Sequence, residues 1–306
     1  MTARPDRRQI PLPGGEFLMG SDRHYPEERP ARRVRVDPFR IDAYPVTNRR
    51  FMEFVADTGY VTFAERPPDP GLYPGARPQD LVPGSLVFGM TEGPVDLRDF
   101  RNWWAWTPGA DWRRPLGPGS SLDGLEDHPV VHVAYPDAVA FARWVGLRLP
   151  TDAEWEYAAR GGLEGAEFAW GDQDCQETMP RANTWQGMFP YENTELDGWT
   201  RTSPVGFYTP NGYGLYDMIG NVWEWTSTRY REVPPVAGSR CCGPPRSEQP
   251  APIRTPDPFP SRTIKGGSYL CTIQYCFRYR PAARQPQTID TSAGHIGFRC
   301  VSPDRP

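Results

Sequence analysis

Two cysteines lie five positions apart, Cys271 and Cys276, within the segment KGGSYLCTIQYCFRYRPAAR. Four residues separate them, and no second pair of Cys or His with matching spacing completes a zinc knuckle. Two thiolates alone suit a soft ion of low coordination number, for which Cu(I) is the first-row candidate. The same pair could form a reversible disulfide, or both side chains could be buried as small apolar groups. The spacing alone leaves these three interpretations open.

The chain has six cysteines in total, and the other four are Cys175, Cys241, Cys242 and Cys300. A disulfide framework is typical of short secreted chains and is not expected in a chain of 306 residues. Cys241 and Cys242 are adjacent, and a disulfide between neighbours is strained. We therefore expect this adjacent pair to be structural or incidental.

His128 and His132 are four positions apart, the spacing that would place both imidazoles on one face of a helix. The Pro-Val-Val run between them favours an extended strand instead, in which the two rings lie too far apart to share an ion. A structural role is therefore expected for both. The sequence also contains no Ser-His-Asp signature, phosphate loop or dinucleotide fingerprint.

Two loops are rich in side-chain oxygens. One contains Asn183-Thr-Trp-Gln-Gly with Glu195 and Asp197 further on, and the other runs Asp217-Met-Ile-Gly-Asn-Val-Trp-Glu224. Hard cations such as Ca²⁺ bind side-chain and carbonyl oxygens of this kind. Neither run matches an EF-hand, and Asn, Asp and Gly also stabilise turns without a metal.

Short helices are expected to position these groups. Apolar periodicity, capping residues and terminal glycines predict helices over about 48–58, 136–145 and 152–160. The third begins with a capping box, in which Thr151 is followed three residues on by Glu154.

The remaining chain is predicted to form short strands and long ordered loops. The alternating runs RRVRVDPF and HPVVHVAY predict strands. Residues 66–127 show little periodicity but many Pro, Gly and Trp residues, which indicates an ordered loop, and residues 231–262 form a second Pro-rich loop. No repeat of fixed period is present, so a single mixed domain is expected.

Composition excludes several classes of protein. Glycine and proline number 30 and 37, while aromatic residues reach 13% of the chain, with eleven tryptophans. So many prolines exclude a helical bundle, the aromatic content excludes intrinsic disorder, and no apolar run is long enough to span a membrane. The net charge of −4, without a long basic run, excludes nucleic acid as a partner. The first residues do not read as a secretory signal.

Seven segments together resemble the formylglycine-generating enzyme (sulfatase-modifying factor) family, bacterial type. The resemblance runs from about residue 9 to residue 301 and is carried by PGGEFLMGS, YPVTNRRFMEFVADTGY, HPVVHVAYPDAVAFARWVGLRLPTDAEWEYAARGG, ANTWQG, NGYGLYDMIGNVWEWT, KGGSYLCTIQYCFRYRPAAR and HIGFRC. It implies an α+β fold, irregular and loop-rich, related to C-type lectins. It also implies one domain over residues 1–306, with a core at about 9–301 and a Pro-rich loop at about 231–262.

The resemblance implies a copper-dependent aerobic oxidase. Such an enzyme converts the cysteine of a Cys-x-Pro-x-Arg motif in an unfolded or nascent sulfatase to Cα-formylglycine, with Cu(I) held by Cys271 and Cys276 and O₂ as co-substrate. A monomer in the bacterial cytoplasm is expected. The alternative is a non-catalytic, lectin-like module that binds a peptide or another ligand. An iron sulfoxide synthase of the same fold needs a three-histidine site, which four scattered histidines cannot supply.

The resemblance also implies roles for individual residues. Ser268 and Tyr275 line the catalytic pocket with the two cysteines, and Trp223 forms a wall of the same pocket. Arg284 and His295 lie in segments that line the peptide groove, and Glu65 pairs with the arginine of the substrate motif. The implied calcium ligands form two sets, of which the first is Asn183, Thr184, Asp197 and Trp199 and the second is Asp217, Gly220, Val222 and Glu224. This chain departs from familiar members in the Thr-Ile-Gln-Tyr between the cysteines and in the QPQTIDTSAG stretch after Arg284.

Overall fold

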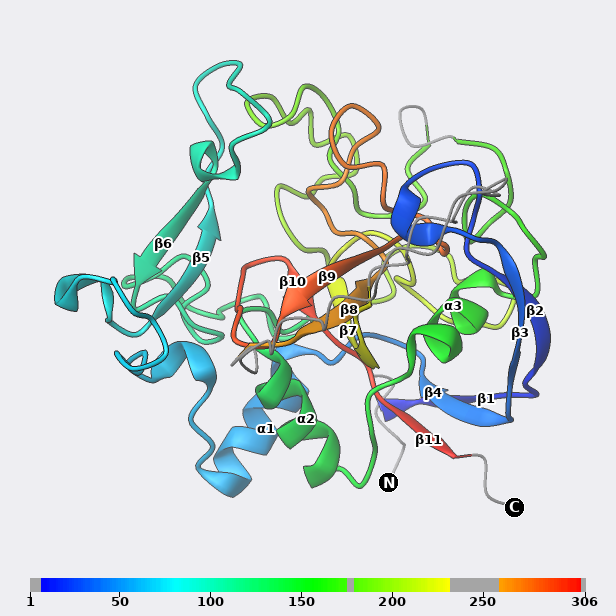
Figure 1. Cartoon of the computed structure of the whole chain (residues 1–306), viewed down its shortest axis with the longest axis horizontal. Coiled ribbons are helices and arrows are strands. Elements are labelled where there is room, and N and C mark those ends of the chain that lie inside the picture. The colour runs from blue at the N-terminus through cyan, green and yellow to red at the C-terminus, as the bar shows by residue number, and fades with distance from the viewer. Residues whose placement is uncertain (1–6, 175–178, 232–258, 304–306) are drawn as a thin grey trace, which may run out of the picture.

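The computed structural model describes residues 7–174, 179–231 and 259–303, which form several small sheets and short helices joined by long loops (Figure 1). Helices account for 16% and strands for 22% of the structure, so the predicted low content of regular secondary structure is confirmed. Cys175, Cys241, Cys242 and most of the Pro-rich loop lie outside the described residues. Within the described residues, no helix combines the length and apolarity needed to cross a membrane.

The three predicted helices are confirmed as α1 (Asn48–Thr58), α2 (Tyr135–Trp144) and α3 (Asp152–Arg160). Thr47 caps α1 by accepting a hydrogen bond from Arg50 N, and Thr151 and Glu154 form the predicted capping box of α3. Both helices end at a glycine in the left-handed conformation, Gly59 and Gly161, which a residue without Cβ adopts at little cost.

The strands form four separate sheets. A three-stranded sheet has the order β1-β4-β11, a mixed four-stranded sheet has the order β10-β7-β8-β9, and β2-β3 and β5-β6 are antiparallel pairs. The strand bounds are β1 (Gln9–Leu12), β2 (Gly15–Met19), β3 (Arg32–Val36), β4 (Phe39–Asp42), β5 (Gly84–Phe88), β6 (Trp104–Pro108), β7 (Trp223–Arg229), β8 (Ser261–Lys265), β9 (Arg284–Thr288), β10 (Ile296–Gly297) and β11 (Val301–Pro303).

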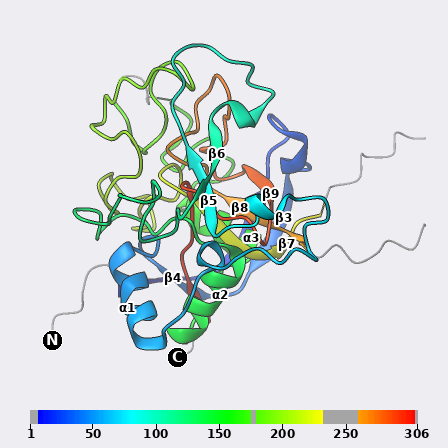
Figure 2. The same ribbon diagram turned by 90° about the vertical axis from the view of Figure 1, so that its left-hand side faces the viewer.

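The β5-β6 pair and the β2-β3 pair lie on opposite sides of the four-stranded sheet, with α1 and α2 together below it (Figures 1 and 2). The predicted strand over RRVRVDPF is divided between β3 and β4. The β5-β6 pair was not predicted, because residues 66–127 were expected to form a loop.

The predicted strand over residues 128–135 is wrong. His132 has a φ of 59°, which a continuous strand does not tolerate, and Tyr135 already begins α2. The backbone here pairs one residue at a time with separate partners, since Val130 N donates to Val46 O at 2.9 Å and His132 N donates to Ala293 O at 3.0 Å. The structural role expected for His132 is consistent with its full burial and with Ser85 Oγ at 2.7 Å from its Nδ1.

Aromatic rings form two buried clusters. The larger one includes Phe51 packed against Phe141, Trp112 and Phe298, which joins α1, α2 and the C-terminal segment. The smaller cluster consists of Phe88, Trp103, Trp185, Phe189, Tyr269 and Leu270. It includes Tyr269 and Leu270, directly before Cys271, so the cysteine segment is anchored to rings from distant parts of the chain.

Candidate active site

Cys271 and Cys276 converge in a tight turn that follows β8. Their Sγ atoms are 3.2 Å apart. Cys271 N donates to Ser268 O at 2.9 Å, and Cys276 N donates to Thr272 O at 2.9 Å, so backbone hydrogen bonds fold both ends of the segment inward. Cys271 is buried and Cys276 is partly exposed, so the second cysteine lies nearer the surface than the first.

The double glycine before the turn allows this close folding. Gly267 has a φ of 70°, and a Cβ on it would lie 2.9 Å from Arg278 O and from Tyr279 N. No side chain fits at that distance, so the chain leaving β8 passes directly against the chain that follows Cys276. The GGS motif thereby closes the loop that carries the two thiols.

The two thiols differ in acidity. Burial raises the pKa of Cys271 well above its usual range. The hydrogen bond from Cys271 lowers the pKa of Cys276, against the opposing effect of burial, and the nearby Arg278 guanidinium lowers it further. Cys276 is therefore the more acidic thiol of the pair. Soft metals bind the deprotonated sulfur, so the lowered pKa of Cys276 favours metal binding at that residue.

Aromatic rings surround the outer sulfur. Tyr275 stacks on Phe189 with a centroid distance of 4.8 Å and meets the edge of Trp103 at 5.3 Å. Trp185 N donates to Cys271 O at 3.0 Å, which fixes the loop of Phe189 to the turn. Sequence reasoning identified Tyr275 but missed Trp103, Trp185 and Phe189, whose only signal was the abundance of tryptophan in segments expected to be loops.

Ser268 lies next to Cys271, but its hydroxyl group is buried within the turn. Its backbone N–H donates to Cys271 Sγ at 3.4 Å, and its Oγ accepts from Leu270 N at 3.3 Å. The residue therefore orients the first cysteine and stabilises the turn.

Trp223 and His295 are brought together where β7 and β10 pair. Trp223 N donates to His295 O at 2.9 Å, and Trp223 is buried. The His295 ring lies 4.6 Å from the ring of Trp104, which itself packs against the smaller aromatic cluster. Burial lowers the pKa of His295 to about 3, so its imidazole is neutral near pH 7. Its Nδ1 has no hydrogen-bond partner among the described residues.

Arg284 and Glu65 each have partners within the chain. Arg284 Nη2 lies 3.0 Å from Asp152 Oδ2, and its Nη1 donates to Glu27 O at 3.3 Å. Glu65 closes the capping box of a short 3₁₀ turn with Thr62 and also pairs with Arg113. For either residue to bind a substrate peptide, it would have to exchange these partners.

The first predicted calcium loop has an oxygen-rich donor set. Asp197 Oδ1 accepts from Trp199 N at 3.0 Å and its Oδ2 accepts from Tyr208 Oη at 2.5 Å, while Asn183 and Thr184, earlier in the chain, are buried. An amide oxygen, a partly exposed carboxylate and the Thr184 and Trp199 carbonyls fit a hard cation chemically.

The second predicted calcium loop fits less well. Both carboxylate oxygens of Glu224 accept hydrogen bonds from the buried Arg299, at 2.8 Å, and Trp155 Nε1 donates to the same group. A carboxylate satisfied in this way does not fit as a cation ligand. Asp217 is different, since burial raises its pKa to about 6, although Gly206 N donates to its Oδ2 at 2.7 Å. In the described ranges, no three or more His, Cys, Asp or Glu side chains cluster as a metal site.

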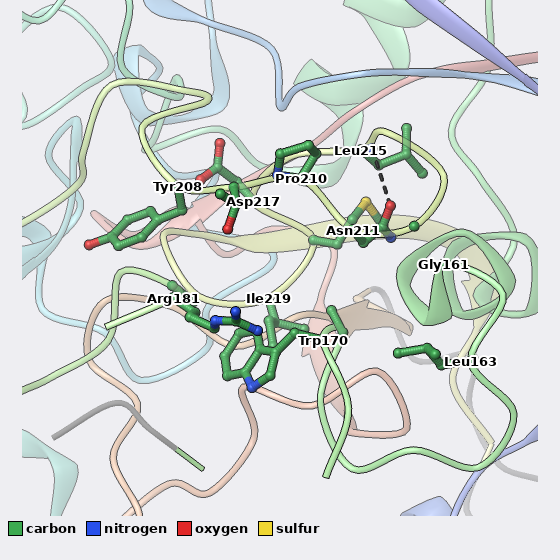
Figure 3. A pocket seen from close by; sticks show the side chains of 15 residues that line it. Gly161, Leu163, Trp170, Arg181, Tyr208, Pro210, Asn211, Leu215, Asp217 and Ile219 are labelled. Carbon is green, nitrogen blue, oxygen red and sulfur yellow. Dashed lines mark hydrogen bonds between the residues drawn. The ribbon is translucent and has the colours of Figure 1, made fainter. Parts of the chain in front are cut away.

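A cavity of about 360 Å³ lies beside this second loop, and none of the described residues that line it is a cysteine (Figure 3). Asp217 and Tyr208 lie along one side of it, and Arg181 and Trp170 lie opposite them. The cavity therefore lies beside the second predicted calcium loop and is separate from the cysteine turn.

Comparison with known proteins gives one consistent result. Residues 2–303 match the family described as "Sulfatase-modifying factor enzyme 1-like domain". The chain is 58% identical to the formylglycine-generating enzyme of Mycobacterium tuberculosis over 96% of this chain and 97% of that one. It is also 38% identical to the mouse protein named inactive C-alpha-formylglycine-generating enzyme 2, over 97% of this chain and 86% of that one.

The fold is also found among solved structures. The structure of PvdO from Pseudomonas aeruginosa covers 96% of this chain and 93% of its own, with a TM-score of 0.60 at 24% identity. That likeness supports the irregular fold expected from the sequence. From the match over nearly its full length, together with the cysteine turn described above, the chain belongs to the sulfatase-modifying factor, or formylglycine-generating enzyme, family.

Proposed function

We propose that this chain is a copper-dependent oxidase that converts the cysteine of a Cys-x-Pro-x-Arg motif in an unfolded or nascent sulfatase to Cα-formylglycine. The observation that carries the proposal is the 3.2 Å approach of the Cys271 and Cys276 sulfur atoms in a turn whose second cysteine is partly exposed. The 58% identity to a protein named formylglycine-generating enzyme supports it. Because the family also contains relatives named inactive, membership alone is insufficient and the site must carry the argument.

Copper fits the donor set. Cys271 and Cys276 are free thiols, and among the described residues no further His, Cys, Asp or Glu joins them in a group of three or more. Two thiolates alone favour Cu(I) over zinc, which takes four ligands. When bound, Cu(I) supplies the one-electron chemistry that O₂ requires. A metal held by only two protein ligands also has room for the substrate thiol.

The residues around the turn hold the substrate and exclude water. Tyr275 is 37% exposed, so its outer edge is available to an approaching peptide while its ring is fixed by Phe189. The buried Cys271 and the surrounding tryptophans keep the site dry. In the overall conversion the substrate –CH₂SH gives up two electrons and two protons to O₂, and water hydrolyses the thioaldehyde-level product, which releases H₂S and leaves –CHO. O₂ is reduced to hydrogen peroxide, or to water where an external thiol supplies two further electrons.

The proposal extends to calcium and to cellular setting. Calcium is proposed for the first loop, with Asn183, Thr184, Asp197 and Trp199 as ligands, and at Asp217 with the carbonyls of Gly220 and Val222 in the second. Removal of calcium with a chelator should lower the melting temperature of the protein. An unchanged melting temperature would contradict the calcium proposal. A monomer in a reducing bacterial cytoplasm suits a chain in which Cys271, Cys276 and Cys300 are free thiols.

The decisive experiment is mass spectrometry of a Cys-x-Pro-x-Arg peptide after incubation with copper-loaded protein and O₂. Conversion replaces –CH₂SH by –CHO and lowers the peptide mass accordingly. Cys271→Ser and Cys276→Ser should abolish both Cu(I) binding and conversion, whereas Cys300→Ser should retain them. An unchanged peptide at full copper occupancy would contradict the oxidase and favour the non-catalytic binding module.

A further inference from the structure

A short N-terminal segment, residues 24–28, holds the chain that leaves Cys276. Phe277 N donates to Tyr25 Oη at 3.1 Å. Glu27 Oε1 lies 2.7 Å from Arg278 Nη2, and Glu28 forms two hydrogen bonds with Arg280, at 2.9 and 2.5 Å. We call this segment the brace. The sequence did not predict the brace, because the residues that it contacts, Phe277, Arg278 and Arg280, lie near the other end of the chain.

The two arginines that the brace contacts are held differently. Arg280 is almost fully buried, and Glu28 engages both of its terminal nitrogens while its Nε donates to Phe277 O. All three guanidinium nitrogens of Arg280 therefore already donate hydrogen bonds within the protein. Arg278 is 21% exposed, pairs with Glu27 through Nη2, and has a buried Nε without a hydrogen-bond partner among the described residues.

The position of Arg278 is fixed by three contacts. Its guanidinium lies 3.7 Å from the centroid of the Tyr25 ring, its backbone N donates to Cys276 O at 2.7 Å, and Glu27 holds Nη2. Cation–π contact and ion pairing together restrict a long side chain that would otherwise be mobile. The guanidinium is therefore held over the Tyr25 ring, whose hydroxyl group accepts from the N–H of Phe277, the residue directly after Cys276. From this position its positive charge lowers the pKa of the Cys276 thiol.

A two-thiolate copper site needs a nearby positive charge. Two thiolates and Cu(I) together carry one net negative charge, and burying an uncompensated charge in a poorly polar site is costly. The positive charge that lowers the pKa of both thiols is that of Arg278. Arg278 is the cation that the fold places there.

We propose that Arg278 is a positioning residue for the copper site, held by Tyr25 and Glu27, and that its charge stabilises the metal-bound form of Cys271 and Cys276. This inference rests on the proposed copper function. It gives the brace a role in metal binding, although the brace contains neither of the two cysteines.

The test is a competition titration of Cu(I) between the protein and a chromogenic Cu(I) chelator. We expect Arg278→Met to weaken Cu(I) binding about tenfold or more, and Arg278→Lys to restore most of it, since charge is the requirement. Arg148→Met is the matched control, because Arg148 also forms an ion pair, with Glu154, but belongs to another part of the fold. That variant should bind Cu(I) as the unmodified chain does.

The variant Glu27→Gln tests whether Arg278 acts through its positive charge or only through its structural contact with the brace. If Arg278 acts through its charge, removing the negative charge of Glu27 while keeping its carbonyl-type acceptor leaves Cu(I) affinity unchanged or higher. Equal loss of affinity in Glu27→Gln and Arg278→Met would indicate a purely structural clamp and overturn the inference. Near-ultraviolet circular dichroism of each variant shows whether the fold is retained.

The outcomes distinguish this inference from the function on which it rests. Unaltered Cu(I) affinity in Arg278→Met, with tight binding by the unmodified chain, overturns the role of Arg278 alone. Failure of the unmodified chain to bind Cu(I) contradicts the copper function and removes the inference with it.

Discussion

The rings of Tyr275 and Phe189 lie parallel, with an interplanar angle of 2° and centroids 4.8 Å apart. This stack ties the cysteine turn to a loop that also contacts Cys271 O through Trp185 N. The exposed side of the stack borders the partly exposed Cys276, so the same rings that hold the turn also shape the approach to it.

Removing the stack should impair catalysis more than removing the hydroxyl group. We expect Tyr275→Ala to lower kcat/KM for peptide conversion about tenfold or more, and to cost about 1 kcal/mol of unfolding free energy, because an aromatic pair is lost. Tyr275→Phe keeps the stack and should retain most of both. Phe207→Ala, which removes a 54% exposed ring packed on Trp199 and Tyr208, is the control for loss of an aromatic contact elsewhere. Equal kinetics for Tyr275→Ala and Phe207→Ala would contradict this role.

The free thiols should react in a fixed order. Cys276 has a lowered pKa and is partly exposed, whereas Cys300 is fully buried and burial raises its pKa. Because alkylating agents attack the accessible thiolate, Cys276 should be modified well before Cys300 in the metal-free native chain. Peptide mapping by mass spectrometry after brief iodoacetamide treatment measures the order. Modification of Cys300 first, or at the same rate, would show that the described environments are wrong.

Local sequence patterns predicted the parts of this structure that depend on neighbours along the chain. The ends of α1 and α3 follow from Thr47, Thr151 and their closing glycines, because caps act within a few residues. The pairing of Cys271 with Cys276 is also local, as both lie in one turn. Hydrogen bonds within five residues decide all of these features.

What the sequence did not predict depends on distant partners. The strand expected at 128–135 failed because His132 takes a left-handed conformation while its ring is held by Ser85, far away in sequence. The aromatic wall and the brace were missed for the same reason. Trp103, Phe189 and Tyr25 reach the cysteine turn only after the whole chain has folded, and no periodicity marks them.

A buried lysine should be essential for stability. Lys265, the chain's only lysine, is fully buried, with Nζ 2.9 Å from Glu156 Oε2 and 3.4 Å from Asp152 Oδ1. Burial alone would raise the pKa of Glu156, but Lys265 and Arg160 together lower it. Lys265→Met leaves these buried carboxylates undercompensated and should cost about 3–5 kcal/mol in urea unfolding. The exposed pair of Arg49 and Asp127 is the control, and Arg49→Met should cost less than about 1 kcal/mol. Similar losses in the two variants would contradict the argument.

Two buried histidines should each make the fold less stable in mildly acidic solution. Burial lowers the pKa of His132 to about 4, and that of His295 to about 3, from an ordinary value of about 6.5. Between about pH 6.5 and pH 4 these two imidazoles take up protons in the unfolded chain but not in the folded one, so each contributes a decrease in unfolding free energy as the pH is lowered. The buried carboxyls of Asp137 and Asp217, whose pKa burial raises to about 6, act in the opposite direction below that pH.

His132 alone should contribute up to about 3 kcal/mol to this loss, which follows from the size of its pKa shift. The measurement is urea unfolding at intervals from pH 7 to pH 4 for the unmodified chain and for His132→Asn, whose amide can still bond to Ser85. The variant starts less stable, because it loses the contact of Nε2 with Pro115 O at 2.9 Å. Its unfolding free energy should nevertheless depend less steeply on pH, since one titrating group is gone. Parallel curves for the two proteins would show that His132 takes up no proton on unfolding.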